Sequence, residues 1–179
     1  NDTVRQGRVV SFLANGLYVL GDHAGAITAA RRATEIARLL DDFPPRVTAD
    51  IYAARALHAL GRYRESTELF RGVVDAFSGN RANEYAGLPV LPAAYARSYL
   101  AMGLSELGDF AAALSAGHEA VAIAEATGHA DTIQWACYAL GLTLLDRGDA
   151  EGASVLLERA LSICRSAELP VYVPRAAAA

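Results

Sequence analysis

Residues 53–73 read AARALHALGRYRESTELFRGV, and the same arrangement of residues occurs three more times along the chain. The other copies are LANGLYVLGDHAGAITAARRA at 13–33, LAMGLSELGDFAAALSAGHEA at 100–120 and LGLTLLDRGDAEGASVLLERA at 140–160. Each copy predicts a helix, a tight turn at its central glycine and a second helix. Four such hairpins in succession are typical of a solenoid of stacked repeats.

Residues of fixed size recur around the four central glycines, which are Gly21, Gly61, Gly108 and Gly148. Four residues before each glycine stands a leucine: Leu17, Leu57, Leu104 and Leu144. Seven positions before each glycine stand Ala14, Ala54, Ala101 and Gly141, and five positions after it stand Ala26, Ser66, Ala113 and Ala153. Twelve positions after it stand Ala33, Val73, Ala120 and Ala160, so all of these residues are small except the valine. Small side chains let two helices approach closely and leucine fills the space between them, so these positions predict the buried seams. We expect each glycine to end its first helix with a positive φ angle.

The pattern predicts an all-α chain of four helix-turn-helix hairpins wound into a right-handed superhelix. The expected helices are 3–20 and 23–40, 46–60 and 63–77, 92–107 and 110–127, and 130–147 and 150–167, so that the repeats span about 3–40, 46–77, 92–127 and 130–167. The segments 41–45 and 78–92 are rich in helix breakers and predict connectors. Residues 171–179 read as the start of a further, truncated helix, so we interpret residues 1–179 as one repeat domain cut from a longer protein.

This pattern resembles the tetratricopeptide repeat, in which Leu-Gly or Leu-Ala, a glycine turn followed by an aromatic residue, an alanine and a final small residue recur through a helix pair. The resemblance covers nearly the whole chain and is strongest at 54–73, with Tyr63 and Phe70 in the aromatic places, and at 100–120, with Phe110. The glycines are 40, 47 and 40 residues apart, whereas the family's usual repeat has about 34 residues. These longer helices are similar to the variant found beside ATPase, nucleotide cyclase or DNA-binding domains in bacterial signalling proteins.

Composition and charge argue against several classes of function. The net charge is −4, every cationic side chain is arginine, and Arg31–Arg32 is the sole adjacent basic pair, so we expect no binding to nucleic acid. No apolar run reaches the length of a membrane span, and we expect a cytoplasmic protein that does not enter membranes. Cys137 and Cys164 lie 27 residues apart in apolar patterns, which predicts buried thiols.

No local pattern of a catalytic, metal or cofactor site is present in the sequence. His118-Glu119 lacks the second histidine that a zinc helix requires, and the other histidines, His23, His58 and His129, stand far apart. We therefore predict a chain that is not an enzyme and holds no cofactor or metal.

A partner would contact the first helices of the hairpins, because these line the concave face of a stacked array. The positions expected to face this groove include Asn15, Tyr18, Arg55 and His58 in the first half and Tyr95, Met102, Trp135, Tyr138 and Leu142 in the second. Rigid aromatic rings beside arginine are typical of binding surfaces. The alternative is that the aromatic residues pack against the neighbouring hairpin or a missing helix, since an aromatic stripe at helical spacing is often core.

These observations predict a non-catalytic interaction or regulatory module that binds a peptide, a protein or a domain of its own parent chain. A second reading is self-association as a homodimer through Leu161, Val171 and Tyr172, and a third is a small-molecule sensor in an ATPase-coupled regulator. The long connector 78–92 also offers Asn83, Glu84, Tyr85 and Leu88 as partner contacts, although a plain loop is the simpler interpretation.

Overall fold

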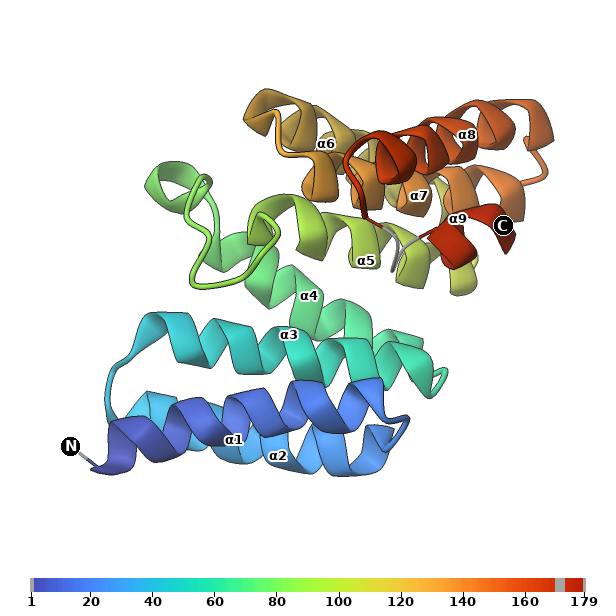
Figure 1. Cartoon of the computed structure of the whole chain (residues 1–179). Coiled ribbons are helices and arrows are strands. Elements are labelled where there is room, and N and C mark those ends of the chain that lie inside the picture. The colour runs from blue at the N-terminus through green and yellow to red at the C-terminus, as the bar shows by residue number, and fades with distance from the viewer. Residues whose placement is uncertain (1, 170–172, 179) are drawn as a thin grey trace. The chain divides into compact units, whose positions relative to one another are not determined.

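The computed structural model describes residues 2–169 and 173–178, the side chains of 2–4, 8 and 174–176 excepted. Within these residues all regular structure is helical (Figure 1). The helices are α1 (Asp2–Val19), α2 (His23–Leu39), α3 (Phe43–Ala59), α4 (Tyr63–Ala76), the 3-10 turn η1 (Gly79–Arg81), α5 (Pro92–Glu106), α6 (Phe110–Thr127), α7 (Ala130–Asp146), α8 (Ala150–Ser166) and α9 (Val173–Ala178). The all-α prediction is confirmed, and each predicted helix has a counterpart whose ends lie within three residues of the expected ones.

The chain divides into two compact units, Asn1–Leu88 and Pro89–Ala179. In the first unit α1 pairs with α2 and α3 with α4, while α2 and α1 both pack against α3. In the second unit α5 pairs with α6 and α7 with α8, α5 and α6 both pack against α7, and α9 packs against α8. Each unit is thus two consecutive hairpins in contact. The single domain over 1–179 and the right-handed superhelix stay predictions.

The recurring small residues form the seams between helices, as predicted. Eleven of the twelve expose 1% of their surface or less, and the twelfth, Gly141, is buried as well. Gly141 shows how close the approach is, because a Cβ atom there would lie 2.8 Å from Cγ of Leu157. The seam positions therefore fix the spacing of α7 and α8, which is too short for a larger side chain at residue 141.

The turn inside each hairpin is a left-handed glycine. The φ angles are +84° at Gly21, +72° at Gly61, +79° at Gly108 and +89° at Gly148, a region that costs little energy only for glycine. The next residue is the N-cap of the second helix. In three hairpins it is an aspartate whose carboxylate accepts a hydrogen bond from a first-turn N–H: Asp22 for α2, Asp109 for α6 and Asp149 for α8.

The helix α4 begins differently. Arg62 occupies the position of those aspartates, and no side chain caps the first turn of α4. Instead the Arg62 guanidinium forms a two-pronged contact with Glu65, with N···O distances of 2.7 and 2.6 Å. The pair is exposed, so solvent screens it and it contributes little to stability. The second hairpin therefore lacks a capping hydrogen bond that the other three possess.

The expected connector at 41–45 is wrong in its second half, because α3 already begins at Phe43. Pro44 and Pro45 occupy its first turn. Proline is tolerated there, since a first-turn N–H has no partner inside the helix and the fixed φ angle of proline suits helical backbone. The guanidinium of Arg81 stacks on the Phe43 ring, with its carbon 3.8 Å from the ring centroid. This contact joins the start of the long connector to the start of α3.

Candidate functional site

The structure brings three of the predicted groove residues of the first unit into contact. Nη1 of Arg55 in α3 donates a hydrogen bond to Oδ1 of Asn15 in α1, over 3.2 Å. The Arg55 guanidinium carbon also lies 4.1 Å from the ring centroid of Tyr18, in a cation–π contact. All three side chains are half-buried. Two side chains of α1 thus hold the arginine that projects from α3.

His58 lies one helical turn after Arg55 and completes this set, which we call the Arg55 surface: Asn15, Tyr18, Arg55 and His58. Its ring packs edge-to-face on Tyr63, with centroids 5.1 Å apart. Burial lowers the pKa of His58 below the ordinary value of 6.5, because desolvation disfavours the charged imidazolium. His58 is therefore neutral at physiological pH, and Arg55 supplies the positive charge of this surface.

Arg55 also lies near a buried aromatic ring of its own helix. Tyr52, one turn earlier in α3, is buried, and its ring centroid is 5.9 Å from the Arg55 guanidinium carbon. Burial raises the pKa of Tyr52, so its hydroxyl stays protonated. A guanidinium held in such partly desolvated surroundings suits a carboxylate or a backbone carbonyl, because its planar fork presents several N–H donors in fixed directions.

The predicted aromatic residues of the second unit form a cluster around Trp135. Its ring lies 5.4 Å from Tyr95, 5.3 Å from Tyr99 and 5.7 Å from Tyr138, measured between centroids. Tyr95 and Tyr99 belong to α5 and the other two to α7, so the rings fill the interface of two neighbouring first helices. Tilted ring pairs at these distances add stability beyond the area they bury.

Burial separates the members of this second set. Trp135 is 5% exposed and Met102 is 8% exposed, whereas Tyr95, Tyr138 and Leu142 are half-buried. In the described structure Trp135 therefore packs between neighbouring hairpins, as the alternative interpretation expects. Contact of Trp135 and Met102 with a partner stays a prediction, and Tyr138 and Leu142 are the side chains of this set best placed to meet one.

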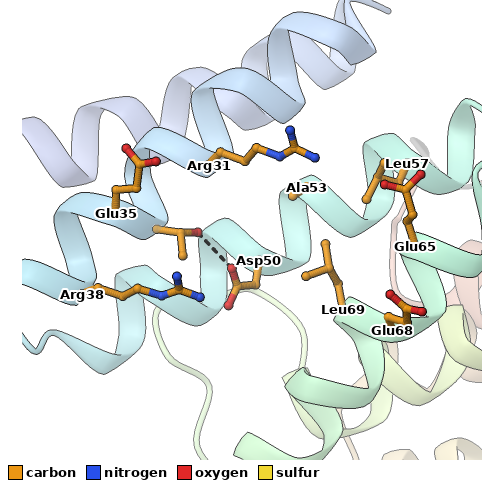
Figure 2. A pocket seen from close by; sticks show the side chains of 10 residues that line it. Arg31, Glu35, Arg38, Asp50, Ala53, Leu57, Glu65, Glu68 and Leu69 are labelled. Carbon is orange, nitrogen blue, oxygen red and sulfur yellow. Dashed lines mark hydrogen bonds between the residues drawn. The ribbon is translucent and has the colours of Figure 1, made fainter.

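Sequence reasoning missed a cleft of about 330 Å³ on the other side of the first unit, between α2 and α4 over α3. Figure 2 shows the guanidinium groups of Arg31 and Arg38 on the α2 side and the carboxylates of Glu65 and Glu68 on the α4 side. The remaining lining residues are Thr34, Glu35, Asp50, Ala53, Leu57 and Leu69. We call this site the charged cleft.

Asp50 lies on the α3 side of the charged cleft. Its Oδ1 accepts a hydrogen bond from the Thr34 hydroxyl over 2.9 Å (Figure 2). Burial raises the pKa of Asp50 above its ordinary value, although the Thr34 hydrogen bond and the charges of Arg38 and Arg46 act in the opposite direction. The seven-residue spacing of Arg31 and Arg38 was a usable signal for this cleft, because it places both cations on one face of a helix.

The other predicted contact residues are scattered. In the long connector Asn83, Glu84 and Tyr85 are exposed and Leu88 is half-buried. Leu161 lines a cavity along α8 that also includes Ala177 of α9, whereas Val171 and Tyr172 lie outside the described residues.

Across the described part of the chain, no three histidine, cysteine or acidic side chains come together as a metal site would require. None of the helices described is both long and apolar enough to cross a membrane.

Several solved structures share this fold at low sequence identity. A Rap protein complexed with Competence and Sporulation Factor superposes with a TM-score of 0.77 and 16% identity, over 90% of this chain and 43% of that one. The apo form of RapI gives 0.77 and 14%, over 98% and 62%. A kinesin light chain-like repeat protein from Podosopora anserina gives 0.69 and 20%, over 93% and 77%. The chain thus spans less than two thirds of the length of either Rap structure.

Sequence comparison finds the repeats themselves. No curated protein matches the chain. Two family models described as tetratricopeptide repeat match it, one at residues 93–127 and 135–168 and the other at 7–32 and 47–71. The matched segments fall on all four hairpins, in agreement with the glycine pattern and with the helices of both units. The chain belongs to the tetratricopeptide-repeat family.

Proposed function

We propose that the chain is a protein-binding module whose Arg55 surface takes an acidic peptide segment or an acidic part of a neighbouring domain. The observation that carries the proposal is the fixation of Arg55 by Asn15 at 3.2 Å and by the Tyr18 ring at 4.1 Å. A side chain already held in place loses little conformational entropy when it binds, so more of the interaction energy appears as affinity.

The family and the similar structures support a binding role. Tetratricopeptide repeats stack helices into extended surfaces, which is a design for recognition. The Rap structure is described as a complex with Competence and Sporulation Factor, so that protein, which has a similar fold, binds a partner. We extend the proposal to a regulatory role within a larger bacterial signalling protein, in which the bound partner controls another domain.

The test uses a phage-displayed peptide library panned on the whole chain, followed by titration calorimetry with the enriched peptides. We expect these peptides to carry aspartate, glutamate or a terminal carboxylate. Arg55→Gln should weaken their binding by about ten- to a hundredfold, because a hydrogen bond to a charged group contributes about 1.5–3 kcal/mol.

The matched control is Arg159→Gln in α8 of the second unit, which removes an exposed arginine that is paired with Glu125. Circular dichroism establishes that both variants are folded. Equal affinity of wild type and Arg55→Gln for every enriched peptide would exclude the Arg55 surface as the binding site, and the absence of enriched peptides would count against a peptide ligand.

A second candidate function rests on the charged cleft, whose α2 side carries Arg31 and Arg38 together with Glu35 and whose α4 side carries carboxylates alone. A small zwitterion such as an amino acid would place its carboxylate near Arg31 and Arg38 and its ammonium near Glu65 and Glu68. Because a ligand that binds only the folded state stabilises it, thermal unfolding with a panel of amino acids at millimolar concentration tests this sensor role. A melting temperature that rises with one amino acid, but not in Arg38→Gln, supports it; an unchanged melting temperature across the panel counts against it.

A further inference from the structure

From Val9 onward, helix α1 is apolar on two opposite sides. One side faces α2 and α3 and holds Ala14, which is fully buried, and Tyr18. At 100° per residue, the opposite side carries a second set within one arc, which we call the α1 stripe: Val9, Phe12, Leu13, Gly16, Val19 and the adjoining Leu20. Its large side chains are 52–83% exposed, with Phe12 at 72%. A helix that is apolar all round is normally buried on both sides.

The internal repeats show what happens to this face elsewhere in the chain. Counted back from the central glycine, Phe12 and Gly16 in α1 correspond to Tyr52 and Ala56 in α3. In α3 all four equivalents of Val9, Phe12, Leu13 and Gly16 are 8% exposed or less: Ala49, Tyr52, Ala53 and Ala56. In α7 the four equivalents are 2% exposed or less: Ala136, Ala139, Leu140 and Thr143.

A preceding hairpin covers those equivalent faces, since α1 and α2 pack on α3, and α5 and α6 pack on α7. The α1 stripe therefore continues a kind of interface that the chain already uses twice, but it has no cover among the described residues. Contiguous exposed apolar surface of this kind marks interaction sites in soluble proteins.

We propose that the α1 stripe is the contact surface of a homodimer in which α1 of one copy crosses α1 of a second copy, antiparallel, at Gly16. The stripe is self-complementary about this residue. Phe12 lies four positions before Gly16 and Leu20 four after it, while Leu13 and Val19 lie three before and three after. A two-fold axis at Gly16 therefore sets Phe12 against the other copy's Leu20 and Leu13 against its Val19, as an isologous interface requires.

Gly16 itself supports the crossing point. A Cβ atom added there would meet nothing within 4 Å, so the fold of the single chain does not need a glycine at this position. A missing side chain lets two helix backbones approach closely, and this approach gives Gly16 a use. The stripe from Val9 to Leu20 contains no charged residue, so no like charges oppose each other across the axis. Tyr18 points to the other side of α1, so the dimer contact is distinct from the Arg55 surface.

Sedimentation velocity of the whole chain tests the proposal. We expect the wild-type mass to rise with concentration from the 18.9 kDa monomer towards twice that value. Phe12→Glu should stay at the monomer mass over the same range, because it sets a charged carboxylate against Leu20 of the other copy at both ends of the contact. Val155→Glu is the matched control, since Val155 is a 64% exposed apolar residue of α8 away from the stripe, and it should dimerise like the wild type.

Disulfide trapping tests the geometry separately from the affinity. Cys137 and Cys164 are 0% and 1% exposed, so Gly16→Cys provides the accessible thiol among the described residues. A covalent dimer should form rapidly under mild oxidation with Gly16→Cys and slowly with Val155→Cys. A wild type that is monomeric at every concentration, a Phe12→Glu variant that still dimerises, or equal trapping by the two cysteine variants would each overturn the proposal. Calorimetry with Arg55→Gln measures peptide binding and not dimerisation, so a negative result for one proposal does not decide the other.

Discussion

The hydroxyl of Thr132 accepts a hydrogen bond from the backbone N–H of Leu91 over 3.2 Å, although the two residues are 41 positions apart. Both residues are buried, at 2% and 0% exposure. Leu91 directly precedes α5, so the first turn of α7 fixes the point where the long connector enters the second unit. A buried N–H group without a partner is costly, and Thr132 supplies that partner.

We expect Thr132→Val to lower the free energy of unfolding by about 1–3 kcal/mol, because it keeps the shape of the side chain and leaves the Leu91 N–H unsatisfied. Urea unfolding followed by circular dichroism measures the change. Thr28→Val is the control, since the Thr28 hydroxyl bonds to a carbonyl at an exposed position of α2. Equal effects of the two substitutions would show that the Leu91 hydrogen bond does not matter for stability.

Two glycine substitutions should change the stability of the fold in opposite directions. Gly141→Ala is expected to destabilise the fold by about 1–3 kcal/mol, because the new methyl group would lie 2.8 and 2.9 Å from Cγ and Cδ2 of Leu157. Gly72→Ala in α4 meets nothing within 4 Å and should stabilise by about 0.5–1 kcal/mol, because alanine has the higher helix propensity. Thermal unfolding compares the two variants. A Gly141→Ala variant as stable as the wild type would mean that α7 and α8 separate without cost.

The raised pKa of Asp50 predicts that Asp50→Asn stabilises the chain at neutral pH. In the wild type the unfolded carboxyl ionises at about its ordinary value of 3.8 and the folded one at a higher pH, so stability falls as pH rises through this window and stays lower above it. The amide introduced by this substitution would keep an oxygen to accept from Thr34 and would carry no charge to desolvate.

The increase in the free energy of unfolding caused by Asp50→Asn should therefore be full at pH 7 and vanish below pH 3.8. Urea unfolding at several pH values measures it. Asp75→Asn in α4 removes an exposed carboxylate and serves as the control. A gain from Asp50→Asn that does not depend on pH would show that desolvation of the Asp50 carboxylate is not its cause.

His58 predicts a pH dependence of the opposite sign. Its pKa is lowered in the folded chain, so as pH falls below the ordinary value of 6.5 the unfolded chain binds a proton before the folded one, and stability declines until the folded pKa is passed. His58→Gln should flatten this decline, whereas His118→Gln, which changes an exposed histidine, should leave it unchanged. Identical pH profiles for His58→Gln and the wild type would contradict the assignment.

The repeat pattern predicted the helices and their seams because both depend on local spacing. The central glycines turn the chain by a backbone preference that needs no knowledge of the rest of the fold, and the alanines around Gly61 and Gly108 mark close helix contacts directly. The start of α3 was predicted three residues late, since Pro44 and Pro45 were interpreted as breakers although a first turn accepts proline.

The candidate sites could be predicted only in part. The pairing of Asn15 with Arg55 joins residues 40 positions apart, and the spacing placed them on one face but could not show that they touch. For Trp135 the spacing allowed both the groove and packing against a neighbouring hairpin, and it could not show that the rings of Tyr95 and Tyr99 lie beside it. The charged cleft was missed because its walls belong to the second helices of two hairpins, and only their packing on α3 creates the space.

The uncapped start of α4 makes the four hairpins unequal in how readily they come apart. A missing cap costs about 1 kcal/mol, so the first turn of α4, at Tyr63, Arg64 and Glu65, should exchange its amide hydrogens sooner than the aspartate-capped turns of α2, α6 and α8. In repeat proteins the stability is close to a sum of local terms, so one weaker helix start lowers the stability of its own hairpin. Among the second helices of the four hairpins, α4 is therefore the one that we expect to begin to fray first.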